Sequence, residues 1–315
     1  MCTCLTLNRN NEFYFGRNLD LDYHFNESVI LTPRNYELRF KKLNSLKSHY
    51  AMIGIGSLID DYPLYAEAFN EKGLCIAGLN FPDNAVYFEP KEDKINIAPY
   101  ELIPYLLGKC ESVDEVLEIM KNANLINIEF KIRLPLSTLH FMVSDKNKSI
   151  VIEQTSDGIK IYDNPVGVLT NNPTFDFHLT NLNNYLNLTN LTPNNRFSDK
   201  LNLKSFSMGM GAIGLPGDAS SVSRFIKATF LKYNLPETSS CPNVQQFFHI
   251  LDSVKIVEGM ALSVHNRPEI TIYSCCADVN NLTYFYKTYD SSKLVGIKMS
   301  DYDLNTKELI DIELE

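Results

Sequence analysis

Short runs of β-branched and aromatic residues dominate both ends of the chain, whereas the middle repeats its apolar residues at helical spacing. The runs at residues 2–8 and 12–17 are separated by Arg9, Asn10 and Asn11. This pattern predicts a β-hairpin at the very N-terminus, with residue 2 at the end of a strand. Further strands are predicted at 51–56, 73–79, 139–143, 149–154, 159–162, 270–276, 282–288 and 294–299. The Asn280-Asn281 pair predicts a second hairpin near the C-terminus.

Helices are predicted at 113–123, 175–187, 220–233 and 243–257, and Ser112 with Glu115 forms a capping box before the first of them. The strands cluster at both ends of the chain and do not alternate regularly with the helices. This order disfavours a doubly wound parallel sheet and favours an α+β protein in which helices cover antiparallel sheets. We find no internal repeat and no low-complexity linker in the 315 residues.

Composition and charge narrow the class of protein. The chain is 44% hydrophobic and 21% charged, as expected of an ordinary globular protein, and its formal net charge of -9 argues against binding to nucleic acid or to an anionic membrane. An anionic substrate would therefore need a local basic site. The N-terminus has no basic segment followed by an apolar one, and no stretch approaches the length of a spanning helix, so we expect a soluble, cytoplasmic protein.

The cysteines are typical of reduced thiols. Their number, seven, is odd, and they are scattered along the chain rather than spaced as a disulfide framework. The adjacent Cys275 and Cys276 point to opposite faces of a predicted strand, and no other Cys/His spacing fits zinc. The sequence therefore predicts neither a metal site nor a cofactor.

Candidate chemistry begins at residue 2. Removal of Met1, which requires a small second residue, would leave Cys2 with a free α-amine, so that a thiol and a base share one residue. An α-amine is matched to accept the thiol proton near neutral pH. Arg17 and Asp20 return on the partner strand of the hairpin, where a cation favours the thiolate and a carboxylate orients the amine.

Together with these residues, a series of motifs resembles the choloylglycine hydrolases and penicillin V acylases, which are N-terminal nucleophile hydrolases. The motifs are MCT at the start, FGRNLD (15–20), TPRNY (32–36), NEKGL (70–74), AGLNFP (77–82), IVIEQT (150–155), VGVLTNNPTFDFH (166–178), GLPGDASSVSRF (214–225) and TYFYKTYD (283–290). They occur in the order and at the spacing of that family and cover nearly the whole chain. The resemblance implies one domain over residues 1–315 with a four-layer αββα sandwich.

The resemblance also implies a role for each matching residue. Cys2 would be the nucleophile and, through its amine, the base; Arg17 would support the thiolate and Asp20 would hold the α-amine. Asn80 and Asn171 would form or brace the oxyanion hole, where amide groups are suitable donors. Arg224 would steady the site. Family members are often tetramers, so the resemblance implies a homo-oligomer, a tetramer by analogy.

The resemblance implies a conjugated bile salt as substrate, and the candidate apolar wall residues are Leu19, Phe25 and Ile59. Asn80 favours bile salts, because penicillin V acylases usually carry Tyr there. Penicillin V or another N-acyl amide, such as an acyl-homoserine lactone, remains an alternative substrate. A papain-like hydrolase using Cys75 or Cys110 with a histidine, and a binding protein without activity, also remain open.

Overall fold

The computed structural model describes residues 1–132, 134–238 and 240–315. Its first sheet has six strands and carries the N-terminal hairpin. In spatial order these strands are β12 (Val168–Leu169), β1 (Cys2–Arg9), β2 (Glu12–Leu21), β13 (Ile270–Asp278), β14 (Thr283–Thr288) and β15 (Val295–Lys298). Asn10 and Asn11, both with positive φ, make the two-residue turn between β1 and β2, because asparagine tolerates the left-handed backbone that such a turn requires. The predicted hairpin is confirmed.

The second sheet has eight strands, all antiparallel to their neighbours. Their order is β11 (Gly158–Asp163), β10 (Ser149–Thr155), β9 (Leu139–Ser144), β6 (Cys75–Asn80), β5 (Tyr62–Asn70), β4 (Met52–Ile59), β3 (Ser28–Thr32) and β16 (Ile310–Glu313). A separate parallel pair joins β7 (Ile95–Ile97) to β8 (Ala123–Leu125). The sheets therefore bring segments from both ends of the chain together.

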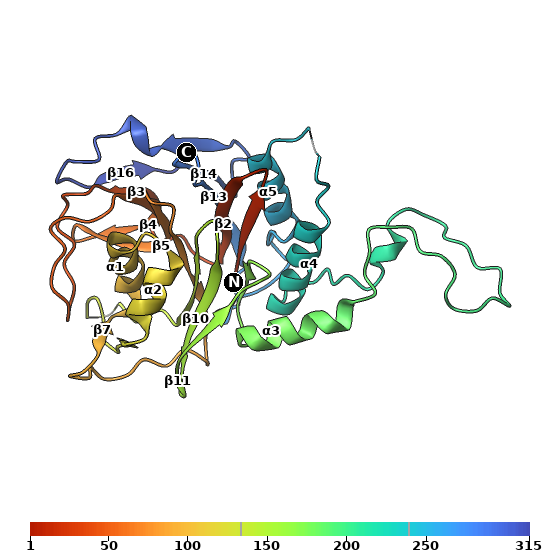
Figure 1. Cartoon of the computed structure of the whole chain (residues 1–315), viewed down its shortest axis with the longest axis horizontal. Coiled ribbons are helices and arrows are strands. Elements are labelled where there is room, and N and C mark those ends of the chain that lie inside the picture. The colour runs from red at the N-terminus through yellow and green to blue at the C-terminus, as the bar shows by residue number, and fades with distance from the viewer. Residues whose placement is uncertain (133, 239) are drawn as a thin grey trace.

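Helices cover the outer faces of the two stacked sheets (Figure 1). The helices α4 (Ser221–Tyr233) and α5 (Asn243–Ser253) pack on the six-stranded sheet, and α1 (Leu102–Lys109) and α2 (Val113–Met120) share a core with the eight-stranded sheet. The other helices among the described residues are α3 (Phe175–Asn181) and the 3₁₀ turns η1 (Pro99–Glu101), η2 (Leu182–Tyr185), η3 (Met210–Ala212) and η4 (Met299–Asp301). The α+β class and its αββα layering are confirmed.

Several predicted bounds differ from the observed elements. The helix predicted at 175–187 is α3 followed by the 3₁₀ turn η2, and the helices predicted at 113–123 and 243–257 end at Met120 and Ser253. The strand predicted at 12–17 continues to Leu21, which carries the hairpin as far as Asp20. Within the described ranges, we find no helix with both the length and the apolar character needed to cross a membrane.

Candidate active site

The register of the N-terminal hairpin brings the first predicted residues together. Cys2 pairs with Leu19, and Cys4 pairs with Arg17. Because alternate residues of a strand face opposite sides and paired residues share a side, Cys2, Arg17 and Leu19 all face the second sheet. Cys2 is almost fully buried at this position.

Arg17 crosses the space between the two sheets. Its Nη1 donates to the carbonyl oxygens of Gly78 at 2.5 Å and Ala66 at 3.3 Å, and lies 3.7 Å from the carboxylate of Glu67. Burial opposes its positive charge, but the anionic groups around it, with Cys2 the strongest, raise the pKa of Arg17 above its ordinary value. Arg17 is therefore a permanent buried cation beside Cys2.

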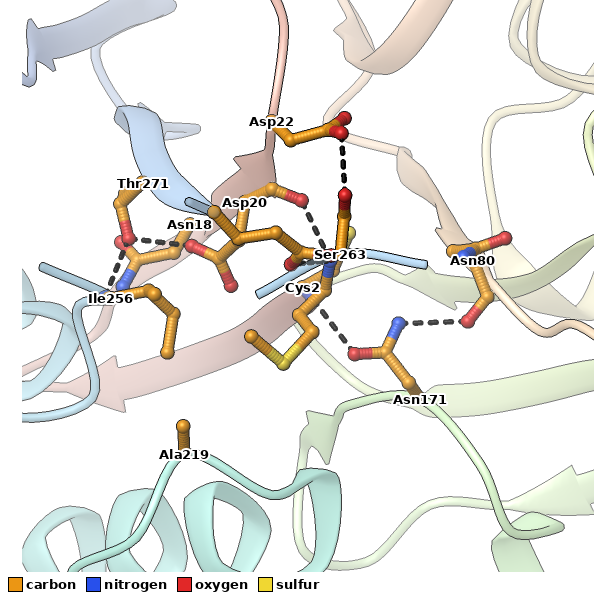
Figure 2. Close-up of polar contacts among 12 residues, drawn as sticks. Cys2, Asn18, Asp20, Asp22, Asn80, Asn171, Ala219, Ile256, Ser263 and Thr271 are labelled. Carbon is orange, nitrogen blue, oxygen red and sulfur yellow. Dashed lines mark hydrogen bonds and ion pairs between the residues drawn. The ribbon is translucent and has the colours of Figure 1, made fainter. Parts of the chain in front are cut away.

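Asn171 lies against the backbone of Cys2 (Figure 2). The N–H of Cys2 donates to Asn171 Oδ1 at 2.8 Å, and Asn171 Nδ2 donates to the carbonyl oxygen of Asn80 at 2.7 Å. The backbone N–H of Asn171 in turn donates to Ser221 Oγ at 2.8 Å. The amide of Asn171 thus links β1 to the end of β6, with its oxygen directed at the nitrogen of Cys2.

Arg224 approaches Cys2 from the helical layer, on α4. Its Nη1 donates to the carbonyl oxygen of Cys2 and, at 2.7 Å, to Thr3 Oγ1, while its Nη2 donates to Asn171 Oδ1 at 2.8 Å. The guanidinium is fully buried, and burial lowers the pKa of Arg224 while the charges of Asp20 and Cys2 act in the opposite direction. Arg224 therefore fixes the main chain of Cys2 and the orientation of Asn171 together.

Asp20 provides a buried carboxylate beside the N-terminus. Thr271 Oγ1 donates to Asp20 Oδ1 at 2.5 Å, whereas Oδ2 has no hydrogen-bond partner among the described residues. Burial raises the pKa of Asp20, although the positive charges of Arg224 and the N-terminal amine partly oppose this shift. The amine of Met1 itself donates to the carbonyl oxygen of Asp20 at 2.7 Å and to Glu269 Oε2 at 3.0 Å. One carboxylate oxygen of Asp20 thus remains free to accept a further cationic donor.

The predicted substrate residues lie in different elements of the fold. Leu19 is the cross-strand neighbour of Cys2, Ile59 ends β4, and Phe25 lies in the segment after β2, where its carbonyl oxygen accepts a hydrogen bond from Ser57 Oγ. Asn80 ends β6 with an exposed side chain whose Oδ1 accepts from Thr138 Oγ1 at 3.2 Å. The fold places Leu19 and Asn80 near Cys2, while the substrate contacts of Leu19, Phe25 and Ile59 remain predictions.

The geometry opposes a nucleophile at either of the two other candidate thiols. Cys75 and Cys110 are buried, and burial raises the pKa of Cys110 to about 12 and that of Cys75 well above its ordinary value. In the part of the chain that the structure describes, neither thiol is hydrogen-bonded to a histidine, as a papain-like pair would be. No group of three or more His, Cys, Asp or Glu side chains in those same ranges is arranged to hold a metal ion.

Comparison with known proteins assigns this arrangement to a family. Residues 2–312 match the family described as linear amide C–N hydrolases, choloylglycine hydrolase family. The chain belongs to the choloylglycine hydrolase family. It is therefore an amide C–N hydrolase, and the predicted resemblance is confirmed over nearly its whole length.

Two members of the choloylglycine hydrolase family illustrate the similarity. The bile salt hydrolase/transferase of Lactiplantibacillus plantarum is 52% identical over 315 residues, which cover 100% of this chain and 97% of that protein. A crystal structure of the C2A mutant of the conjugated bile acid hydrolase from Clostridium perfringens is 38% identical, with a TM-score of 0.93 over 100% of this chain and 97% of that one.

A penicillin V acylase from Agrobacterium tumefaciens is more distant. Its structure has a TM-score of 0.76 at 20% identity, covering 99% of this chain and 91% of that one. The structural likeness shows that the fold is shared. At an identity this low, it does not bear on the substrate.

Sequence reasoning missed several polar residues that surround Cys2 and its neighbours in this chain. Glu67 accepts hydrogen bonds from Tyr273 at 2.8 Å and Tyr284 at 2.7 Å beneath Arg17, and burial raises its pKa. Glu269 holds the Met1 amine, and Thr271 holds Asp20. Glu67, Glu269 and Thr271 stand outside the family motifs. Their only sequence signal is a polar residue within or beside an apolar strand run.

His178 is another residue that sequence reasoning missed, and it is buried behind Asn171. Its Nε2 donates to the carbonyl oxygen of Asn171 at 2.9 Å, which assigns the proton to Nε2, since a carbonyl only accepts. Burial is the main cause that lowers the pKa of His178 from its ordinary 6.5 to about 4. The ring is therefore neutral at physiological pH.

This shift predicts an acid-dependent loss of stability. Because the unfolded chain binds more protons than the native one between pH 6.5 and about 4, the contribution of His178 is present above this window and is lost as the pH falls through it. The unfolding free energy should drop about 1 to 2 kcal/mol more between pH 7 and pH 5 in the wild type than in His178→Gln. Urea titrations at both pH values measure the difference, and equal drops in the two proteins would contradict the assignment.

Proposed function

We propose that the enzyme hydrolyses the amide bond of glycine- and taurine-conjugated bile salts, with Cys2 as N-terminal nucleophile. The observation that carries the substrate is the 52% identity, over the full chain, to a protein named bile salt hydrolase/transferase. The nucleophile is supported by the position of Cys2 among Arg17, Asn171 and Arg224. A bile salt joins a rigid steroid to an acid through an amide, so its site needs an apolar cleft with a polar mouth.

The first half of the reaction forms a thioester. Loss of Met1 frees the α-amine of Cys2, which takes the thiol proton as sulfur attacks the carbonyl carbon. Arg17 favours the sulfur anion, and amide donors at Asn80 and Asn171 stabilise the negative oxygen of the tetrahedral intermediate. Its collapse breaks the C–N bond, and the departing glycine or taurine nitrogen takes the proton from the ammonium.

The second half of the reaction releases the bile acid. The α-amine, now neutral, removes a proton from a water molecule that attacks the thioester carbonyl. The C–S bond breaks, and the proton returns to sulfur. Asp20, with one carboxylate oxygen unpartnered among the described residues, is suited to orient the α-amine in both halves. No cofactor or metal is required in this sequence of steps.

A substrate comparison tests the proposal. The kcat/KM for glycocholate and taurocholate should exceed that for penicillin V by at least about tenfold, because a steroid buries more apolar surface than a phenoxyacetyl group and the surplus can position the carbonyl over Cys2. Asn80→Tyr should narrow the gap, since penicillin V acylases usually carry Tyr at this place. Released amine is measured for each substrate. A penicillin V value equal to or above both bile salt values, or activity on acyl-homoserine lactones alone, would overturn the substrate assignment.

We also propose that the enzyme is a homo-oligomer, with a tetramer as the expected form. An arm that follows η2, residues 186–215, extends away from the two sheets and their helices (Figure 1). It exposes large apolar side chains, namely Leu186, Leu191, Phe197, Leu201, Leu203, Phe206, Met208 and Ile213. Large apolar side chains exposed along one projecting segment are typical of a protein interface. Light scattering on the purified enzyme measures the mass, and a monomer would contradict the proposal.

A further inference from the structure

A buried histidine lies behind Asn171 on the second sheet. His140 belongs to β9, next to the pairing of Leu139 with Asn80, and its fully buried ring stacks on Phe81 at a centroid distance of 4.2 Å. Burial of an imidazole with two polar nitrogens is unfavourable unless both nitrogens have partners. Both nitrogens of His140 have such a partner, and these partners connect the ring to the active site.

The hydrogen bonds of His140 define what it does. Its Nε2 lies 2.9 Å from the carbonyl oxygen of Thr170, and its Nδ1 lies 3.0 Å from Glu153 Oε1. A carbonyl cannot donate, so Nε2 carries a proton. One further proton is shared between Nδ1 and Glu153, because an unprotonated nitrogen would otherwise face a carboxylate. Wherever this second proton lies, His140 donates to Thr170.

The peptide that His140 binds is the one that leads into Asn171. Around this peptide, the carbonyl oxygen of Thr170 accepts from His140, that of Asn171 accepts from His178, and the N–H of Asn171 donates to Ser221. Thr170 Oγ1 also lies 2.8 Å from Ser221 Oγ. With its main chain held at each polar group, Asn171 can direct its side-chain oxygen at Cys2.

We propose that His140, paired with Glu153, is a positioning residue for Asn171 and acts through the Thr170–Asn171 peptide. This inference rests on the proposed function, in which Asn171 serves at Cys2. An amide that stabilises a transition state must be held within a fraction of an ångström, because small displacements reduce the rate markedly. His140 touches neither the substrate nor Cys2, so its effect should pass entirely through Asn171.

The variants are chosen so that no buried charge is left without a partner, since a single charge removed from a buried pair strongly destabilises a fold. His140→Phe and Glu153→Gln are therefore made together as one double variant, in which the glutamine oxygen still accepts from the N–H of Phe175, as Glu153 Oε1 does at 3.0 Å. The phenylalanine retains a ring against Phe81 and removes only the nitrogens. The same double change is made in a background that carries Asn171→Ala.

In the wild-type background, the double change should lower kcat for glycocholate about tenfold, with KM unchanged within about twofold. In the Asn171→Ala background, the same double change should alter kcat by less than about twofold, because the residue that His140 positions is already gone. Equal losses in both backgrounds would overturn the proposal. Full activity of the Asn171→Ala variant itself would instead refute the role of Asn171 in the proposed function. The two failures are therefore distinguishable.

His49→Phe is the matched control for a purely structural role. His49 is also buried with both ring nitrogens at backbone carbonyls, Tyr50 at 2.8 Å and Tyr36 at 2.9 Å, but it contacts none of the residues around Cys2. Its kcat should stay within about twofold of the wild type. A loss as large as that from His140→Phe would assign both effects to folding and overturn the proposal. If His140→Phe does not fold, His140→Gln, whose amide can still donate to Thr170, is compared instead and should retain more kcat than His140→Leu.

Discussion

Cys2→Ala should abolish hydrolysis of every amide substrate, with kcat at least about 10⁴-fold below that of the wild type. The methyl group of alanine cannot form the thioester, and the neighbouring thiol of Cys4, which pairs with Arg17, is kept protonated because burial raises its pKa. The expected loss is specific to chemistry. Cys2 bonds to Asn171 and Arg224 through its main-chain N–H and carbonyl oxygen, and alanine retains both groups. Released amine is measured under conditions in which intact folding is verified by circular dichroism.

Cys75→Ala and Cys110→Ala are the matched controls for this experiment. Both thiols are buried apolar groups whose raised pKa keeps them protonated, so their replacement should cost stability through a small cavity and leave kcat within a few-fold of the wild type. Retained activity in Cys2→Ala together with loss in Cys75→Ala or Cys110→Ala would transfer the nucleophile to a papain-like arrangement.

The N-terminal hairpin illustrates what local sequence can predict. Asn10 and Asn11 adopt the left-handed backbone of a two-residue turn, and the strands on each side have the β-prone residues that continue it. A two-residue turn fixes the register, because it pairs Arg9 with Glu12 and every earlier residue of β1 with the next residue of β2. This register pairs Cys2 with Leu19 and brings Arg17 close to Cys2. This part of the site was predictable because every interaction that forms it is local.

Elements without a clear period were harder to predict. Helix α1 is buried along almost its whole length, so its residues have no polar face to reveal helical spacing, and Pro104 lies within it. Strand β5 carries Pro63 near its start and Glu67 in its buried part, both of which are unusual in a strand. The stability of both elements comes from tertiary packing, which a local pattern does not contain.

The polar residues around Cys2 were also not predictable from local sequence, because their partners lie far away in the chain. Glu67 is accommodated because Tyr273 and Tyr284, more than 200 positions away in the chain, donate hydrogen bonds to it. His140 bonds to Thr170, thirty positions further on, directly after β12 of the other sheet. The family motifs located Asn171 and Arg224, whereas the side chains that hold these residues in place became visible only through the fold.

Removal of Met1 should control activity, because it determines whether the nitrogen of Cys2 can act as a base. While Met1 is attached, this nitrogen is a peptide N–H that donates to Asn171 Oδ1, and its lone pair is delocalised into the amide, so it cannot accept the thiol proton. The amine of Met1 is a base, but it lies one residue away and is paired with Glu269 at 3.0 Å. The chain with Met1 therefore has its nucleophile in place and its base in the wrong place.

A leucine inserted between Met1 and Cys2 should block methionine removal and lower kcat by about 10²–10⁴-fold, the usual contribution of a general base. Arg17 would still lie beside the thiol, so alkylation of Cys2 by iodoacetamide should persist while turnover is lost. Intact-mass measurement verifies the N-terminus in each preparation. The control replaces the leucine by a protease site whose cleavage leaves Cys2 first, and cleavage should restore kcat to within about twofold of the wild type. A fully active enzyme whose intact mass retains Met1 would refute the α-amine as the base, because no free nitrogen would then remain on Cys2 to take the proton.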